Sequence, residues 1–175
     1  MFKRKKDPLR KGFELLRDVR ILKDRVSKIQ NRIDDRAEEL RKKLVDLQMK
    51  GEQYLATRYA EEIAKLKELS QRFSLIMFIL DKVDLAIQHA IIKHEFGVLA
   101  DELKDLVKDV TKLPETRIPD VSLLFADLEA SVRELSEISM SDYASVSYNP
   151  PSNSEVKAIL EEAKEVLRKK LEPAS

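Results

Sequence analysis

The side chains able to do chemistry are few in this sequence. The chain has two histidines, His89 and His94, and no cysteine. Residues five apart on a helix point to different faces, so the two imidazoles are not expected to share a metal ion. The lack of cysteine excludes disulfides, thiolate metal sites and cysteine nucleophiles. We expect both histidines to be structural.

No recognisable catalytic motif is present. The sequence contains no Gly-rich phosphate loop, and two histidines on one predicted helix offer no Ser-His-Asp set. The many carboxylates are expected on exposed helix faces, where no cleft would shift their pKa values. We therefore expect a chain that is not an enzyme, with no catalytic residue, no cofactor and no metal ion.

The basic residues near the start of the chain indicate binding to an anionic surface. Residues 1–50 carry 17 basic and 9 acidic side chains, a net charge of +8, whereas residues 51–175 carry 16 and 23, a net charge of −7. An aromatic residue beside a basic cluster, as at the start of this chain, suits a membrane interface. The predicted membrane-binding residues are Phe2, Lys3, Arg4, Lys5, Lys6, Arg10, Arg17, Arg25, Lys28 and Arg32.

The face of the first helix that carries these basic residues has a second interpretation. It also contains the acidic residues Glu14, Asp18, Glu39 and Asp46, so it could be a solvated face with ion pairs between neighbouring turns. The alternative is a surface for acidic lipid or an acidic partner, which the Phe2 cluster favours. No nucleic-acid reading module is recognisable, so no nucleic-acid partner is expected.

The elements that must position these residues are two long helices. Apolar residues recur at steps of three and four from Leu22 to Leu47 and again from Ile63 to Val110, which is the seam spacing of helices that pack on a partner. Asp7-Pro8 predicts the start of the first helix, and Lys50-Gly51-Glu52 predicts a turn. We expect residues 1–113 to form an elongated, antiparallel, coiled-coil-like hairpin with arms of roughly 60 Å or more. The fold class is all-α.

Three further segments are predicted after the hairpin. Residues 114–137 are expected to form a connector, bracketed by Pro114 and Pro119, and a short acidic regulatory helix. Residues 138–153, rich in Ser, Tyr, Asn and Pro, are expected to be a flexible linker. Residues 154–172 are expected to form an amphipathic helix that starts with a capping box at Ser152 to Glu155.

The C-terminal helix is expected to bind a partner through its apolar stripe. A single amphipathic helix on a tether commonly docks into a groove of another protein. It could instead dock back on its own hairpin. The predicted partner-binding residues are Val156, Leu160, Ala163, Leu167, Arg168 and Leu171.

No membrane-spanning segment is predicted. The most apolar run, Leu75 to Leu80, is far shorter than the ~20 residues that span a bilayer. The basic start of the chain leads into no apolar signal region, so we expect a cytoplasmic protein that lies peripherally on the membrane.

The pattern as a whole resembles the Snf7 family, the ESCRT-III membrane-remodelling proteins, and in particular the archaeal cell-division members of the CdvB group. The similar features are the basic first arm, the tight turn near Gly51, the change from a basic to an acidic half, and the Leu113 to Pro119 stretch before an acidic helix. The segment from Ser154 to Ala163 also looks like the end of the archaeal members. The resemblance covers most of the chain.

The resemblance implies a filament subunit that constricts membrane at the division site. It implies acidic membrane lipids, other copies of the chain and paralogous subunits as partners, together with an AAA ATPase that grips tail motifs with its MIT domain. Leu160, Leu167 and Arg168 match the helical MIT-interacting motif, whereas Ala163 and Lys164 stand where arginine and leucine belong. The resemblance is to a short paralog without a winged-helix tail.

Two other functions fit the same residues. A phage-shock-type membrane-maintenance protein belongs to the same superfamily. A soluble coiled-coil adaptor that binds a partner and does not polymerise belongs to a different class.

Overall fold

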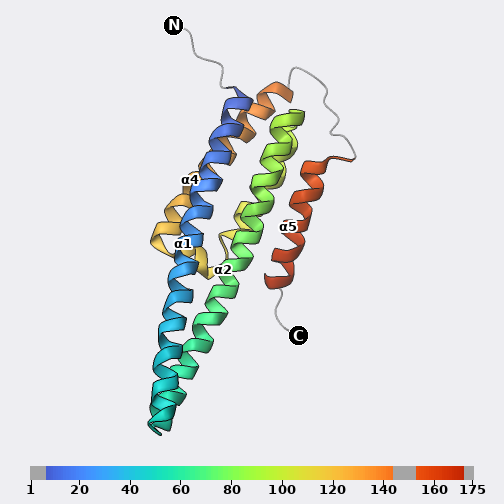
Figure 1. The fold of residues 1–175 in the computed structure, drawn as a ribbon. Helices are drawn as coiled ribbons and strands as arrows, with labels where there is room; N and C mark the ends of the chain where they lie inside the picture. Colours follow the sequence, from blue (N-terminus) through green and yellow to red (C-terminus); the bar gives the residue numbers. More distant parts are fainter. Residues whose placement is uncertain (1–6, 144–152, 172–175) are drawn as a thin grey trace. The chain divides into compact units, whose positions relative to one another are not determined.

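The computed structural model describes residues 7–143 and 153–171, and most of these residues are helical, with no strand among them. This confirms the all-α class. The helices are α1 (Pro8–Met49), α2 (Gln53–Lys93), α3 (Phe96–Val110), α4 (Pro119–Tyr143) and α5 (Glu155–Leu171), with a 3₁₀ turn η1 (Pro114–Arg117) before α4 (Figure 1).

The helices form two compact units. Residues 24–77 form the two-helix unit, and residues up to 23 together with those from 78 onward form the multi-helix unit. Both long helices, α1 and α2, contribute to both units, and each unit is described by itself.

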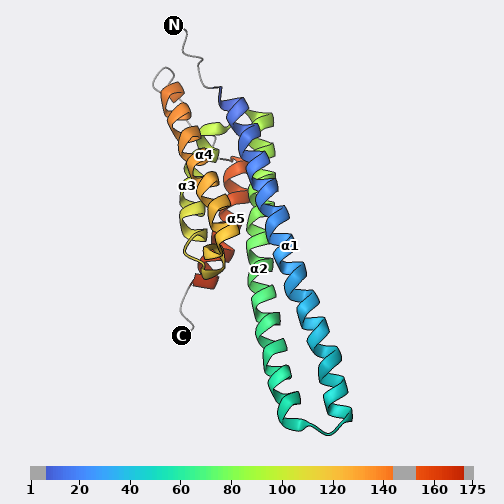
Figure 2. The same ribbon diagram turned by 90° about the vertical axis from the view of Figure 1, so that its left-hand side faces the viewer.

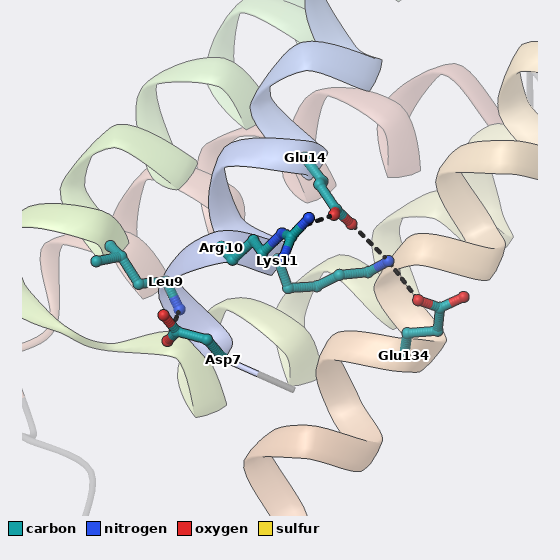
Figure 3. Close-up of polar contacts among 6 residues, drawn as sticks. All are labelled: Asp7, Leu9, Arg10, Lys11, Glu14 and Glu134. Atoms are coloured by element: carbon teal, nitrogen blue, oxygen red, sulfur yellow. Dashed lines mark hydrogen bonds and ion pairs between the residues drawn. The ribbon is translucent and has the colours of Figure 1, made fainter. Parts of the chain in front are cut away.

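Helix α1 begins where the sequence predicts. The backbone N–H of Leu9 donates to Oδ1 of Asp7 at 3.0 Å, so Asp7 satisfies a backbone donor of the first turn (Figure 3). Pro8 occupies the first helical position, where a missing N–H costs nothing. No separate short helix precedes the main arm in the described residues, because α1 is continuous from Pro8 to Met49.

The two-helix unit pairs the second part of α1 with the first part of α2 in antiparallel directions (Figure 2). The turn between them lies at residues 50–52, and Gly51 adopts a φ of 76°, which favours glycine. Nε2 of Gln30 donates to the carbonyl oxygen of Ser70 at 3.0 Å, and Oγ of Ser70 donates to Asp34 at 2.7 Å. The predicted seam residues of this unit are buried or half-buried, among them Ala37, Leu40 and Ile63.

In the multi-helix unit, the first part of α1 and the last part of α2 lie side by side, α3 pairs with α4 behind them, and α5 lies between α2 and α3 (Figures 1 and 2). The buried apolar side chains of this unit come from every helix, for example Val19, Ile87, Leu103, Leu128 and Leu160. The burial of side chains from five helices against one another is the main source of stability expected for such a unit.

The predicted second arm is not one helix. It ends at Lys93, and a new helix begins at Phe96 after His94, which has a φ of 56°. The prediction of continuous helix to residue 110 was therefore wrong at residues 94–95. The prediction that both histidines lie on one helix was wrong for the same reason.

The segment before α5 also differs from the prediction. Leu113 and Ile118 are extended before their prolines, as predicted, but Pro114–Arg117 form a 3₁₀ turn between them. Helix α4 has 25 residues and continues to Tyr143, so the predicted linker of residues 138–153 starts too early. Residues 144–152 lie outside the described part.

A close approach between helices is made possible by Gly12. A Cβ atom built there would lie 3.0 Å from Cε1 of Phe96 and 3.3 Å from Cγ1 of Ile91. The contact joins α1 to α2 and α3 inside the multi-helix unit. Nearby, Nζ of Lys11 donates to carboxylates of Glu14 and of Glu134 on α4 (Figure 3). Burial alone would lower the pKa of Lys11, but these hydrogen bonds and charges raise it.

We expect Gly12→Val to lower the free energy of unfolding by about 1–3 kcal/mol, because its added methyl groups must displace Phe96 or Ile91. Gly12→Ala is the matched variant. Its better helix propensity is worth about 1 kcal/mol, which offsets most of its milder crowding. Urea unfolding measures both. Equal stability of the two variants would contradict the tight contact at Gly12.

Candidate interaction surfaces

The predicted basic surface is a series of exposed side chains on α1. In the multi-helix unit, Arg10 is exposed and lies 3.8 Å from Glu14, one turn later. Arg17 is exposed, and no acidic side chain among the described residues pairs with it. This part of α1 also presents Arg20, which contacts Asp84, so paired arginines and one without a described acidic partner face solvent here.

In the two-helix unit the same mixture recurs. Nζ of Lys28 lies 3.0 Å from Oδ2 of Asp24, an ion pair between exposed side chains, whereas exposed Arg32 has no such partner among the described residues. Arg25 is exposed and interacts with a neighbouring group. Ion pairs also join Arg36 to Glu39 and Lys50 to Asp46. Exposed pairs of this kind contribute little to stability, so they leave most of the surface available for an anionic partner.

The remaining predicted membrane-binding residues, Phe2, Lys3, Arg4, Lys5 and Lys6, lie outside the described residues.

The predicted partner-binding helix is docked on its own chain. Val156, Leu160, Ala163 and Leu167 are buried, each with at most 1% of its surface exposed, in the multi-helix unit where α5 packs against α3. Arg168 and Leu171 are exposed at the last turn. The sequence pattern allowed α5 to dock either on its own chain or on a partner. In the structure, α5 docks on its own chain.

Charged side chains fix α5 at several points along its length. Lys164 donates to Glu102 of α3, and both side chains are mostly buried. Nζ of Lys82 on α2 donates to Glu162 at 2.6 Å. At the start of the helix, Oε2 of Glu155 lies 2.9 Å from Nδ1 of His89, also on α2. These contacts give α5 a defined register as well as an apolar contact.

The N-terminus of α5 is held by a buried hydrogen bond that the sequence did not indicate. Oγ of Ser154 accepts a hydrogen bond from the backbone N–H of Lys157 and donates one to Oε2 of Glu95 at 2.8 Å. Ser154 is thus the N-cap residue, two positions after the serine in the predicted capping box, and Glu155 binds His89 instead of the backbone. Glu95 is itself the residue that precedes α3. A single contact therefore connects the starts of two helices.

A polar groove lies between α1 and α2 in the multi-helix unit. It is lined by Arg20, Lys23, Asp81, Asp84, Leu85 and Gln88. Oδ2 of Asp84 lies 3.4 Å from both Arg20 and Lys23, and Nε2 of Gln88 donates to its other oxygen at 2.6 Å. Burial by itself would raise the pKa of Asp84, but the hydrogen bonds from Gln88 and Arg20 and the charge of Lys23 hold it below its ordinary value of 3.8.

The groove was missed in the sequence, although one signal for it existed. Asp84 is a lone acidic residue between the buried residues Val83 and Ala86, and a carboxylate in such a position requires a cationic partner. Its partners come from the opposite helix, and sequence spacing on α2 alone does not reveal them.

The described residues contain no group of three or more His, Asp or Glu side chains that could hold a metal ion. None of the described helices is both long and apolar enough to cross a membrane.

Comparison of the chain with family models, curated proteins and solved structures gave no match.

We expect Leu160→Asp to release α5 and lower the stability of the multi-helix unit by about 3 kcal/mol or more, because a carboxylate would be buried without a partner. Leu171→Asp, on the exposed last turn, is the matched control and should change stability by less than about 0.5 kcal/mol. Hydrogen exchange of the α5 amides should increase strongly in the first variant only. Unchanged exchange in Leu160→Asp would contradict the docking of α5.

We expect the charge of Asp84 to stabilise the fold at neutral pH. Its folded-state pKa is lowered, so this contribution is present above its unfolded pKa and is lost as the pH falls through the folded value. Asp84→Asn should therefore be less stable than the wild type by about 2 kcal/mol near pH 7 and by less in acid. Urea unfolding from about pH 7 to pH 2.5 measures the difference.

The control for this experiment is Asp81→Asn. Asp81 lies 2.8 Å from Lys23 in the same groove but is more than half exposed, so its loss should cost under about 1 kcal/mol. A penalty for Asp84→Asn that does not depend on pH would count against a stabilising role for its charge.

Proposed function

We propose that this chain is a non-enzymatic, filament-forming subunit of the ESCRT-III type that binds and remodels membrane during archaeal cell division. The proposal includes an elongated, coiled-coil-like hairpin built from α1 and α2, a location on the cytoplasmic side of the membrane, and assembly with other copies or paralogs. The single observation that carries it is the exposure of basic side chains on α1, Arg10 and Arg17 in the multi-helix unit and Arg25, Lys28 and Arg32 in the two-helix unit.

Electrostatics support an anionic lipid surface as the partner of these residues. Each basic residue close to an acidic bilayer contributes ~1 kcal/mol, so several of them give useful affinity even after losses to ion pairing. Arg17 and Arg32 have no acidic partner among the described residues, and Arg10 and Lys28 are paired only with exposed neighbours. Such residues can approach phosphate groups without exposing a buried charge.

The docked position of α5 supports a subunit in which α5 can exchange its contact with α3 for a contact with a partner. Its apolar stripe is the part expected to bind an MIT domain, and in the described structure Val156, Leu160, Ala163 and Leu167 of that stripe are covered by the chain itself. Binding of α5 to the AAA ATPase would therefore compete with docking on α3. This competition would multiply the apparent affinity for the ATPase by the fraction of time that α5 is undocked, and so would lower it.

We expect Lys28→Glu combined with Arg32→Glu to weaken binding to acidic vesicles at least about tenfold, since about 1 kcal/mol is lost for each basic residue removed and repulsion adds to it. The matched control is Lys65→Glu with Lys67→Glu, which makes the same change in net charge with exposed lysines of α2 in the same unit. Co-sedimentation with vesicles that contain acidic lipid, and with neutral vesicles, measures the effect.

An equal loss for both double variants would show that only net charge matters and would contradict a basic surface on α1. Equal binding of the wild type to neutral and acidic vesicles would contradict the membrane proposal itself. Negative-stain microscopy of the same samples tests assembly separately: a chain that binds vesicles without forming filaments would contradict the filament-forming subunit. A chain that does neither would favour the soluble adaptor.

A further inference from the structure

Helix α2 carries an exposed line of apolar side chains in the multi-helix unit. Phe78, Leu85 and Ile92 are seven residues apart, and 39%, 40% and 75% of their respective surfaces are exposed. Residues seven apart on a helix lie nearly above one another, so the three form one stripe. The buried residues of the same segment, such as Val83, Ile87 and Ala90, lie on the opposite side of the helix.

The stripe has a different helix on each side. In the view of Figure 1, α2 of this unit lies between α1 and α5, and Figure 2 shows α3 and α4 behind α2. On the α1 side, Nε of Arg20 contacts Asp84 at 3.4 Å. On the α5 side, Nζ of Lys82 contacts Glu162 at 2.6 Å. Because Asp84 and Lys82 are two residues apart, Arg20 and Glu162 lie within about 3 Å of the same level along α2.

The two sides of the stripe carry opposite charge at that level. The side chain of Arg20 is 58% exposed and that of Glu162 is 62% exposed, although each touches α2. Arg17, one turn before Arg20, and Glu161, next to Glu162, are also exposed. Arg20 pairs with Asp84 and Glu162 pairs with Lys82 on α2 itself, so opposite charges stand at the two outer edges of the surface, arginine on α1 and glutamate on α5.

We propose that this face binds the same face of a second copy of the chain, with a two-fold axis parallel to α2. Under that symmetry each stripe residue meets its own counterpart, so Leu85 packs against Leu85 and Ile92 against Ile92. The axis also places the α1 edge of each copy opposite the α5 edge of the other, so Arg20 approaches Glu162 of the second copy, and the same contact occurs twice. A contact of this kind is isologous and closed.

The charges favour a second copy over other occupants. A membrane or a nucleic acid would attract the arginines but repel Glu162 and Glu161 at the opposite edge. A face with positive charge on one side of an apolar line and negative charge on the other is complementary to a copy of itself that is rotated by 180°. A line of three side chains is small, so the contact is weak and reversible.

This inference goes beyond the proposed function. A closed two-fold contact makes a dimer and does not extend into a filament, so it neither requires membrane nor supplies the open-ended contact of a polymer. Its test is made without lipid, and its failure would leave the vesicle experiment unaffected.

Because the chain has no cysteine, single cysteines test the geometry directly. Leu85→Cys and Ile92→Cys each place one thiol on the stripe, and Leu123→Cys places one at an apolar position on α4 that is more exposed than Leu85 and nearly as exposed as Ile92. Under mild oxidation of the full chain in low salt, we expect a disulfide-linked dimer to form at least about tenfold faster in the first two variants than in the control. Circular dichroism checks that all three remain folded.

The pattern of cross-links decides the proposal. Fast linkage at both stripe positions supports it. Fast linkage at residue 85 alone indicates an antiparallel pairing and overturns the parallel two-fold arrangement. Rates equal to that of Leu123→Cys at both positions overturn the interface altogether.

The charge pairing has its own test in the Leu85→Cys background. Glu162→Lys should slow cross-linking by about tenfold at low salt, because two repulsive contacts replace two attractive ones. Asp127→Lys, an exposed position on α4, makes the same change in net charge. Equal rates in these two variants would overturn the pairing of the α1 edge with the α5 edge.

Discussion

The change of direction at the end of α2 is the constraint on which the packing of the later helices depends. Within Lys93, His94 and Glu95 the chain leaves one helix and starts another, and His94 adopts a left-handed conformation to do so. That conformation is costly for a residue with a side chain and persists only where the surroundings determine it. Here the surroundings include Phe96, which packs edge-on against the ring of His94 and lies beside Gly12 of α1.

The same junction also holds the last helix. Glu95 is buried and accepts a hydrogen bond from Ser154, so the start of α3 and the start of α5 are connected through one carboxylate. A buried carboxylate without a partner is costly, so release of α5 would leave Glu95 in need of water or of another donor. A partner that removes α5 must therefore offset both the loss of the apolar contact and the cost of exposing this junction.

The sequence predicted those parts of the fold that depend on local signals. Asp7-Pro8 predicted the start of α1, Gly51 predicted the turn, and the three-and-four spacing predicted which residues of both long runs are buried. The break at His94 was missed because no proline or glycine occupies it. The spacing of apolar residues also continues across the break, since α2 and α3 each bury one face. The extension of α4 to Tyr143 was missed because Ser and Tyr residues were interpreted as linker composition.

The surfaces were predicted less completely, since their partners lie far away in the chain. The basic residues of α1 could be named from the sequence, but which of them have an acidic neighbour could not. The alternative positions for α5 were recognised without a means of choosing between them. Asp84 shows why: its partners Arg20 and Lys23 are about 60 residues away, and only folding brings them together.

The mostly buried ion pair between Lys164 and Glu102 has a consequence for the way in which α5 responds to heat. Such a pair adds little net stability at ordinary temperature, because removing both charges from water costs about as much as their attraction returns. That cost falls as temperature rises, since the hydration of ions becomes less favourable. The ion pair between α3 and α5 should therefore weaken less on warming than the exposed ion pairs around it. The form of the chain with α5 docked should stay populated at temperatures at which the exposed polar contacts have weakened.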